Sequence, residues 1–287
     1  MKRAISLAAV LLLGWTFARA AESHAAKGIV LKVDAAHRSL VVSCEAILNY
    51  MDAMEMQFNV REAAALANLK PGTAVSFTIV PRGKDLYAED IHISSMANLE
   101  SEPLEAGKLT ALHNAMRPDT RAIAVGDHVP DFSLTDQTGK EIRLSQFAGK
   151  VTLLTFGYSR CPNPNYCFRL SNNLSQVEKR FRAQAGRNLV LMTVVIDPEH
   201  DQGAALVNYA AVWKADPAVW HFLTGSLPEI QKVASTFGMN FWSDDGFMTH
   251  TLHTVIVDRE GKLAVNLEGN SFTAAQLGDL VQTVMKN

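Results

Sequence analysis

The chain has 287 residues, a formal net charge of −2, 48% hydrophobic residues and only three cysteines. This length allows two domains, and the composition is ordinary for a globular protein. The near-neutral charge gives no sign of nucleic-acid binding or of a polybasic membrane anchor, and three cysteines are too few for a disulfide scaffold.

The N-terminus is typical of a secretory signal peptide, residues 1–20. Lys2 and Arg3 precede an apolar run over residues 4–17, and Ala18-Arg19-Ala20 supplies the small residues for cleavage after Ala20. The run is short for a membrane span, so an uncleaved anchor is the lesser alternative and no span is expected after cleavage. The expected location is therefore the periplasm, where conditions are oxidising.

Five short alternating runs within residues 27–94 predict a small all-β, OB-like barrel. The expected strands cover residues 28–33, 39–43, 56–60, 74–80 and 86–93. The expected interior is apolar and consists of Ile29, Leu31, Val33, Leu40, Val42, Val75, Phe77, Ile79, Ile91 and Ile93.

Methionines cluster between the second and third of these runs. Met51, Met54 and Met56 lie within six residues, and Met54 and Met56 share one face if they lie in a strand. Thioethers on one face, with the Cys44 thiol nearby, form a soft ligand set suited to Cu(I) or Ag(I). The alternative is that these methionines are adaptable core residues.

Residues 44–58 resemble the metal-binding loop of CusF-like periplasmic copper- and silver-binding domains, chiefly in the run Met54-Glu55-Met56-Gln57-Phe58. The resemblance implies that the two methionines bind metal together with an upstream histidine. Cys44 stands about where that histidine is expected, so a thiolate would replace an imidazole. Tyr50 is either an aromatic cover of this site or plain packing.

Residues 95–126 are expected to form a partly helical linker, because prolines and a glycine interrupt a weak helical pattern. Residues 127–287 then alternate strands with helices, which predicts an α/β domain with helices on both faces of a central sheet. The expected strands are 129–135, 141–144, 151–156, 189–196, 252–257 and 263–267, and the expected helices are 167–184, 203–213, 227–237 and 273–285.

Two cysteines lie at the turn between the strand at 151–156 and the following helix, where an α/β sheet usually presents its working groups. Asn163-Pro164 is typical of an N-cap and a first helical residue, which puts Cys167 in the first turn and Cys161 just before it. The helix N-terminus and the Arg160 cation both favour thiolates. This pair indicates a redox couple or a soft-metal site, and a structural disulfide is the alternative.

With the cysteines after the first central strand, the order of elements is that of a thioredoxin-like fold. A histidine from the loop before the strand at 252–257 would then complete a site of two thiolates and one imidazole. His250 and His253 compete for this role, and His250 is preferred because it lies at the edge of the loop. Asp197 is expected either to orient a ligand from outside the coordination shell or to cap the next helix.

These features together resemble the SCO/SenC family of copper-binding, thioredoxin-like proteins over nearly all of residues 127–287. The matching runs are Val129-Pro130-Asp131-Phe132, residues 156–162, Asp197-Pro198-Glu199-His200-Asp201, Phe222-Leu223-Thr224-Gly225 and the segment around His250. The resemblance implies that Cys161, Cys167 and His250 bind copper and that the protein assists loading of the CuA centre of cytochrome c oxidase. Five residues separate the two cysteines, where three are commoner in the family.

The predicted function is a periplasmic copper metallochaperone, more a carrier than an enzyme. It would bind Cu(I), with Cu(II) a second option at Cys161, Cys167 and His250. The expected partners are cytochrome c oxidase subunit II or another copper acceptor, and a periplasmic thiol reductant that opens a Cys161–Cys167 disulfide before loading.

Two alternatives stay open. A thiol-disulfide oxidoreductase fits the paired cysteines, although their spacing is not Cys-x-x-Cys and residues 238–260 contain no proline. Sequestration of copper or silver for metal tolerance fits the methionine cluster.

Overall fold

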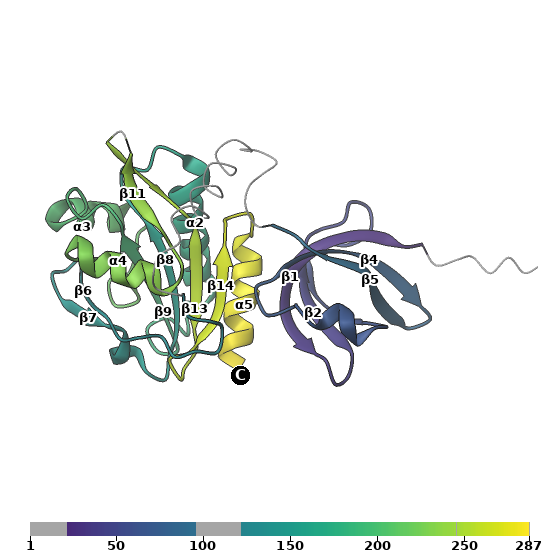
Figure 1. Cartoon of the computed structure of the whole chain (residues 1–287). Helices are drawn as coiled ribbons and strands as arrows, with labels where there is room; N and C mark the ends of the chain where they lie inside the picture. Colours follow the sequence, from purple (N-terminus) through teal and green to yellow (C-terminus); the bar gives the residue numbers. More distant parts are fainter. Residues whose placement is uncertain (1–21, 96–121, 245, 287) are drawn as a thin grey trace, which may run out of the picture.

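The structure is a computed structural model that describes residues 22–95, 122–244 and 246–286. The expected signal peptide and most of the expected linker lie outside these ranges. Within the described ranges, no helix is both long enough and apolar enough to cross a membrane. A closed β-barrel is followed by an α/β domain (Figure 1), which confirms the predicted sequence of fold classes.

Five strands close the barrel in the order β1-β2-β3-β5-β4. They are β1 (His24–Asp34), β2 (Ser39–Cys44), β3 (Met54–Asn59), β4 (Ala74–Arg82) and β5 (Asp85–Ile93), with a short helix η1 (Ala63–Leu66) before β4. Phe58 and Phe77 meet edge to face in the core, with ring centroids 5.0 Å apart. Closure pairs every strand on both sides and so leaves no free sheet edge.

Strand β1 is buried on both faces, and this corrects part of the predicted interior. Val30 packs inside the barrel, whereas Ile29 and Leu31 join the apolar core of the second domain. Ile93, another predicted interior residue, is 59% exposed. The pairing of β1 with β2 shifts register between Val30 and Lys32, so Val33 packs against the barrel core whereas Ile29 and Leu31 do not. When both faces of a strand are apolar, the alternation does not tell which face is inside. The predicted residues that are buried in the barrel core are Leu40, Val42, Val75, Phe77 and Ile79, with Val33 and Ile91 partly buried.

Helix α5 (Ala274–Lys286) lies between the barrel and the sheet of the second domain (Figure 1). The Ser43 hydroxyl donates to Asp279 Oδ2 at 2.7 Å, and Arg180 donates to the other oxygen of that carboxylate at 2.7 Å. Gly72, at φ +89°, lies close to Val265 of the second domain. In any other residue at this position the Cβ would come within 2.7 Å of the Val265 side chain. Apolar packing and a shared carboxylate therefore dock the barrel on the second domain.

The second domain is built on a seven-stranded sheet of order β14-β13-β8-β9-β10-β6-β7. Its central strands are parallel, and the pairs toward both edges are antiparallel. The strands are β6 (Ser133–Asp136), β7 (Glu141–Arg143), β8 (Val151–Gly157), β9 (Leu189–Val195), β10 (Trp220–Thr224), β13 (His253–Val257) and β14 (Leu263–Glu268). Strands β8 and β9 are buried at every residue, as continuous apolar runs predict for strands covered on both faces.

Helices cover both faces of this sheet, as predicted. On one face α2 (Arg169–Arg180), α3 (Gly203–Val212) and α5 share a core with Leu153 and Leu191. On the other face α4 (Leu227–Thr236) packs with Leu154 and Met192. A short helix, η2 (Leu144–Phe147), follows β7.

Two features are absent from the sequence predictions, namely strand β10 and a separate hairpin. The hairpin consists of β11 (Phe241–Asp244) and β12 (Phe247–His250), which pair only with each other. It matters for function because its last residue is His250.

Candidate metal centre

The cysteine turn begins where β8 ends. The Asn163 side chain accepts from the Asn165 N–H at 2.9 Å, and Pro164 opens the helix, so the predicted cap is confirmed. The first turn, η3 (Pro164–Phe168), is a π-helix that contains Cys167. A π turn holds more residues than an α turn, and such turns are frequent at functional sites. Three of the five residues between the two cysteines, Pro164, Asn165 and Tyr166, lie in this turn.

Cys161, Cys167 and His250 come together, although the last two are 83 residues apart in the chain. Cys167 Sγ lies 3.6 Å from His250 Nε2, and the Cys167 thiol hydrogen-bonds to Cys161. With metal–sulfur and metal–nitrogen bonds of about 2.3 and about 2.0 Å, as zinc has, two ligands of one ion lie about 3.5 to 3.8 Å apart. The separation of Cys167 and His250 therefore fits a shared ion.

The three groups do not yet enclose a complete coordination shell. In the part of the chain that the structure describes, no three His, Cys, Asp or Glu side chains are spaced as a ready-made metal site. Cys167 is instead the common neighbour of the other two groups. All three cysteines of the chain are free, so both thiols of the turn are available.

His250 is buried and presents the correct nitrogen to the cysteines. Its Nδ1 lies 2.8 Å from the carbonyl oxygen of Thr251, which can only accept, so Nδ1 carries the proton. Nε2 therefore directs a lone pair toward Cys167. Burial lowers the pKa of His250 to about 4, which keeps the imidazole neutral, the form that binds a metal.

The two thiols of the turn differ in acidity. The hydrogen bond from the Cys167 thiol is the largest effect on Cys161, and it lowers the pKa of Cys161 to about 6 against the opposing effect of burial. The same hydrogen bond, together with burial, raises the pKa of Cys167 well above its usual range. In the metal-free protein Cys161 is therefore the thiolate and Cys167 is the proton donor.

We expect Cys161 to react first when the reduced, metal-free protein is treated with iodoacetamide. Its alkylation rate should follow the thiolate fraction and rise with pH through a midpoint near its pKa of about 6. Cys167 and Cys44 are buried and have raised pKa values, so they should stay largely unmodified over the same range. Mass spectrometry of the digested protein measures all three sites, and equal modification of Cys161 and Cys167 at neutral pH would contradict the prediction.

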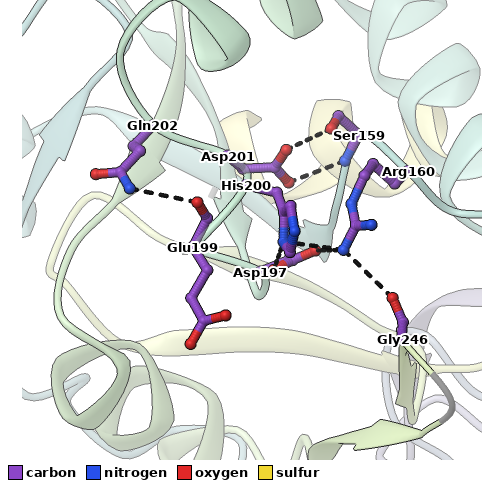
Figure 2. Close-up of polar contacts among 8 residues, drawn as sticks. All are labelled: Ser159, Arg160, Asp197, Glu199, His200, Asp201, Gln202 and Gly246. Carbon is purple, nitrogen blue, oxygen red and sulfur yellow. Dashed lines mark hydrogen bonds and ion pairs between the residues drawn. The ribbon is translucent and has the colours of Figure 1, made fainter.

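Arg160 is paired with carboxylate rather than with the thiolates that it is predicted to favour. Its guanidinium donates to Asp197 Oδ2 at 2.8 Å (Figure 2). Burial would raise the pKa of Asp197, but hydrogen bonds from His200 and Arg160 outweigh it and lower the pKa overall. Asp197 does not cap the next helix, because Gln202 is the residue before α3. The Asp197 carboxylate therefore contacts the cysteine turn by accepting a hydrogen bond from Arg160.

His253, the alternative to His250, faces a different neighbour. It is buried in β13, and its Nδ1 lies 2.9 Å from Asn266 Oδ1. His250 is therefore the imidazole that the fold brings to the cysteines.

The second predicted ligand set lies at one end of the barrel. Cys44, at the end of β2, is directly opposite Met54 at the start of β3, and Met56 is opposite Val42. Directly paired residues share a face with Cβ atoms about 5 Å apart, so these side chains lie on the inward face. Met51 and Met56 are partly buried against the barrel core, while Met54 is 51% exposed.

Cys44 is a core thiol in this structure. It is 1% exposed, burial raises its pKa to about 12, and its Sγ lies 3.8 Å from the Val42 carbonyl oxygen. Among the predicted ligands at this end of the barrel, Met54 is therefore the one most exposed to solvent. Tyr50 stacks on His24 with ring centroids 3.6 Å apart, an aromatic contact that the sequence does not predict.

The fold and the site together describe a thioredoxin-like protein with a cysteine–cysteine–histidine centre, preceded by a methionine-bearing barrel. A family model described as SCO1/SenC matches residues 121–286, which is more than half of the 287-residue chain. The chain therefore belongs to the SCO1/SenC family. A second model, described as Copper binding periplasmic protein CusF, matches residues 23–93.

Individual relatives agree with this assignment. The chain is 28% identical over 172 residues to the mitochondrial Protein SCO2 homolog of Bos taurus, covering 58% of this chain and 62% of that protein. It is 28% identical over 107 residues to the SCO1 protein homolog of Bacillus subtilis (strain 168), covering 37% of this chain and 54% of that protein. The chain thus spans less than two thirds of the length of these curated relatives.

A solved structure supports the fold of the second domain. The crystal structure of a protein from Aquifex aeolicus VF5, described as a proposed electron transfer protein, matches with a TM-score of 0.50 and 18% identity. The match covers 56% of this chain and 94% of that chain. At this identity the likeness concerns the fold alone.

Proposed function

We propose that this protein is a periplasmic copper metallochaperone that assists assembly of the CuA centre of cytochrome c oxidase. The single observation that carries the proposal is the contact of 3.6 Å between Cys167 Sγ and His250 Nε2, beside a hydrogen-bonded Cys161. Thiolate and imidazole ligands together suit copper. The matches to models described as SCO1/SenC and as a copper-binding periplasmic protein support both the metal and the compartment.

Copper is the cargo in this proposal, and each ligand has its own part in loading. Cys161, as the thiolate, would bind Cu(I) first. The metal would then displace the proton of Cys167, which ends the hydrogen bond between the two sulfurs, and the neutral His250 would complete the site. Delivery would run in reverse, as the soft ligands of an acceptor such as subunit II replace these three. A thiol reductant has to open any Cys161–Cys167 disulfide beforehand, because a disulfide is not a thiolate donor.

The barrel would hold a second, more loosely bound copper. Met51, Met54 and Met56 supply thioethers, with Cys44 adjacent to Met54 across the β2–β3 ladder. The exposed Met54 would give an entering ion its first contact. This cluster of methionines also favours sequestration of copper or silver as an alternative role for this half of the chain.

A thiol-disulfide oxidoreductase is the second candidate, and the contrast between the two thiols favours it. A thiolate with a pKa of about 6 beside a buried, protonated partner is a suitable pair of attacking and resolving groups.

Copper stoichiometry on the reduced protein tests these roles. The wild type should retain two Cu(I) ions, and Cys161→Ala and the double variant Met54→Ala/Met56→Ala should each retain one. Met285→Ala, a half-buried methionine near the end of α5, is the matched control and should retain two. Absence of bound copper together with turnover of a disulfide substrate would favour the oxidoreductase instead.

A further inference from the structure

The hairpin that carries His250 belongs to no larger sheet. Strands β11 and β12 pair with each other alone, so no ladder hydrogen bonds tie them to the seven-stranded sheet. The base of the hairpin is closed by the Thr251 N–H, which donates to the Asn240 carbonyl oxygen at 2.9 Å. The position of the tip relative to the cysteine turn must therefore depend on other contacts.

Arg160 supplies such a contact at the tip. One guanidinium nitrogen, Nη2, lies 3.3 Å from the carbonyl oxygen of Gly246, which lies between β11 and β12 (Figure 2). The same nitrogen lies 2.8 Å from Asp197 Oδ2 and 2.9 Å from His200 Nδ1. Asp197 is almost fully buried, with 6% of its side chain exposed, so it is a fixed anchor. Arg160 thus links the hairpin tip to the segment after β9.

The two residues before Arg160 are also held. The Ser159 N–H donates to Asp201 Oδ2 at 2.9 Å, and the Ser159 hydroxyl donates to the other oxygen of that carboxylate (Figure 2). The Tyr158 hydroxyl accepts a hydrogen bond from the Met248 N–H in β12. The Tyr158 ring lies edge to face with the His250 ring, and the two ring centroids are 6.1 Å apart. The backbone leading into Cys161 therefore forms a fixed platform on which the hairpin rests.

We propose that Arg160 is a positioning residue, which holds the tip of the β11–β12 hairpin so that His250 stays within reach of Cys167. It does not bind the metal itself. A guanidinium suits this role because it stays charged and because one of its terminal nitrogens carries two hydrogens, so that nitrogen can donate to the Asp197 carboxylate and to the Gly246 carbonyl oxygen at once. The inference rests on the proposed copper site, but its first test needs no copper.

Hydrogen exchange of the reduced, metal-free protein is the first test. In Arg160→Gln the backbone amides of β12 should exchange faster than in the wild type, because the tip has lost its anchor. Arg143→Gln is the matched control, since Arg143 makes an exposed ion pair of 2.7 Å with Glu141 on β7, at the far edge of the sheet. Unchanged exchange of β12 in Arg160→Gln would overturn the proposal.

Asp197→Asn provides a second route to the same result, should Arg160→Gln fold poorly. It removes the charge of the anchor and leaves Arg160 in place. We expect the same faster exchange of β12, with the far-ultraviolet circular dichroism spectrum of the wild type. Slow, wild-type exchange in this variant would also count against the proposal.

A double-mutant cycle on Cu(I) affinity is the further test, measured by competition with a chromophoric Cu(I) chelator. Arg160→Gln should weaken binding about tenfold, within the range that loss of an outer-shell contact typically causes. In a His250→Ala background the same change should have no further effect, because Arg160 acts through His250. An equal loss in both backgrounds would overturn the proposal. A wild type that binds no Cu(I) would refute the copper site, while the exchange experiment would still decide the role of Arg160.

Discussion

Replacing Cys167 with alanine is expected to weaken Cu(I) binding by the second domain at least about 100-fold. Loss of an outer-shell partner of a metal ligand typically costs 10- to 100-fold in affinity, and the loss of a ligand should cost more. The same change removes the hydrogen bond that contributes most to the low pKa of Cys161. The pKa of Cys161 should therefore rise toward that of an ordinary thiol, so the remaining sulfur ligand would also be mostly protonated at neutral pH.

Two measurements separate these effects. Chelator competition reports the affinity, and the pH profile of Cys161 alkylation in the metal-free variant reports the acidity, with its midpoint expected to move upward from about 6. Cys44→Ala is the matched control, because Cys44 is a buried thiol of the barrel and should leave the alkylation profile of Cys161 unchanged. Wild-type affinity in Cys167→Ala would remove Cys167 from the ligand set.

The cysteine turn could be predicted from the sequence because its signals are local. A continuous apolar run predicts the buried strand β8, and Asn163-Pro164 predicts the start of the helix, so the position of Cys167 follows directly. His250 is predicted as the partner of the cysteines from the order of the elements, but the hairpin that presents it is not predicted. The hairpin consists of β11 and β12, two strands of four residues each, which are too short and too mixed in composition to be recognised.

The contacts of Arg160 could not be predicted either, for a related reason. A guanidinium next to a thiol is expected to stabilise the thiolate, and nothing local indicates that a carboxylate 37 residues away competes for it. The buried Asp197 and the carbonyl oxygen of Gly246 determine where the side chain points. Cys44 shows the same limit in the barrel, because its place beside Met54 follows from strand pairing, whereas its burial depends on how the barrel closes.

Strand β1 shows why the packing of the two domains against each other could not be predicted from the sequence. Val30 and Leu31 are neighbouring apolar residues with 0% and 1% exposure, and they differ only in the face of the strand on which they lie. Val30 belongs to the barrel core, and Leu31 belongs to the core shared with α5 and β14. An apolar residue on either face predicts burial, but it does not name the partner that buries it.

This difference predicts opposite outcomes for the same substitution at adjacent positions. Leu31→Glu would place an unpaired carboxylate in the interface between the domains, at a cost of about 3 kcal/mol or more if the domains stayed together. Separation of the domains would return that carboxylate to water, so the barrel should undock and remain folded. In Val30→Glu the carboxylate would lie inside the barrel, where separation of the domains does not expose it to water. The barrel itself should therefore unfold.

Small-angle scattering and circular dichroism distinguish the two results. Leu31→Glu should increase the radius of gyration and keep the β-sheet signal of the wild type, whereas Val30→Glu should lose the part of that signal that comes from the barrel. Undocking should also break the hydrogen bond between Ser43 and Asp279, so Ser43→Ala, which leaves the Arg180–Asp279 pair of the second domain intact, should destabilise the wild type but not Leu31→Glu. Loss of barrel structure in both variants to the same extent would show that the outward face of β1 is needed for the barrel itself to fold.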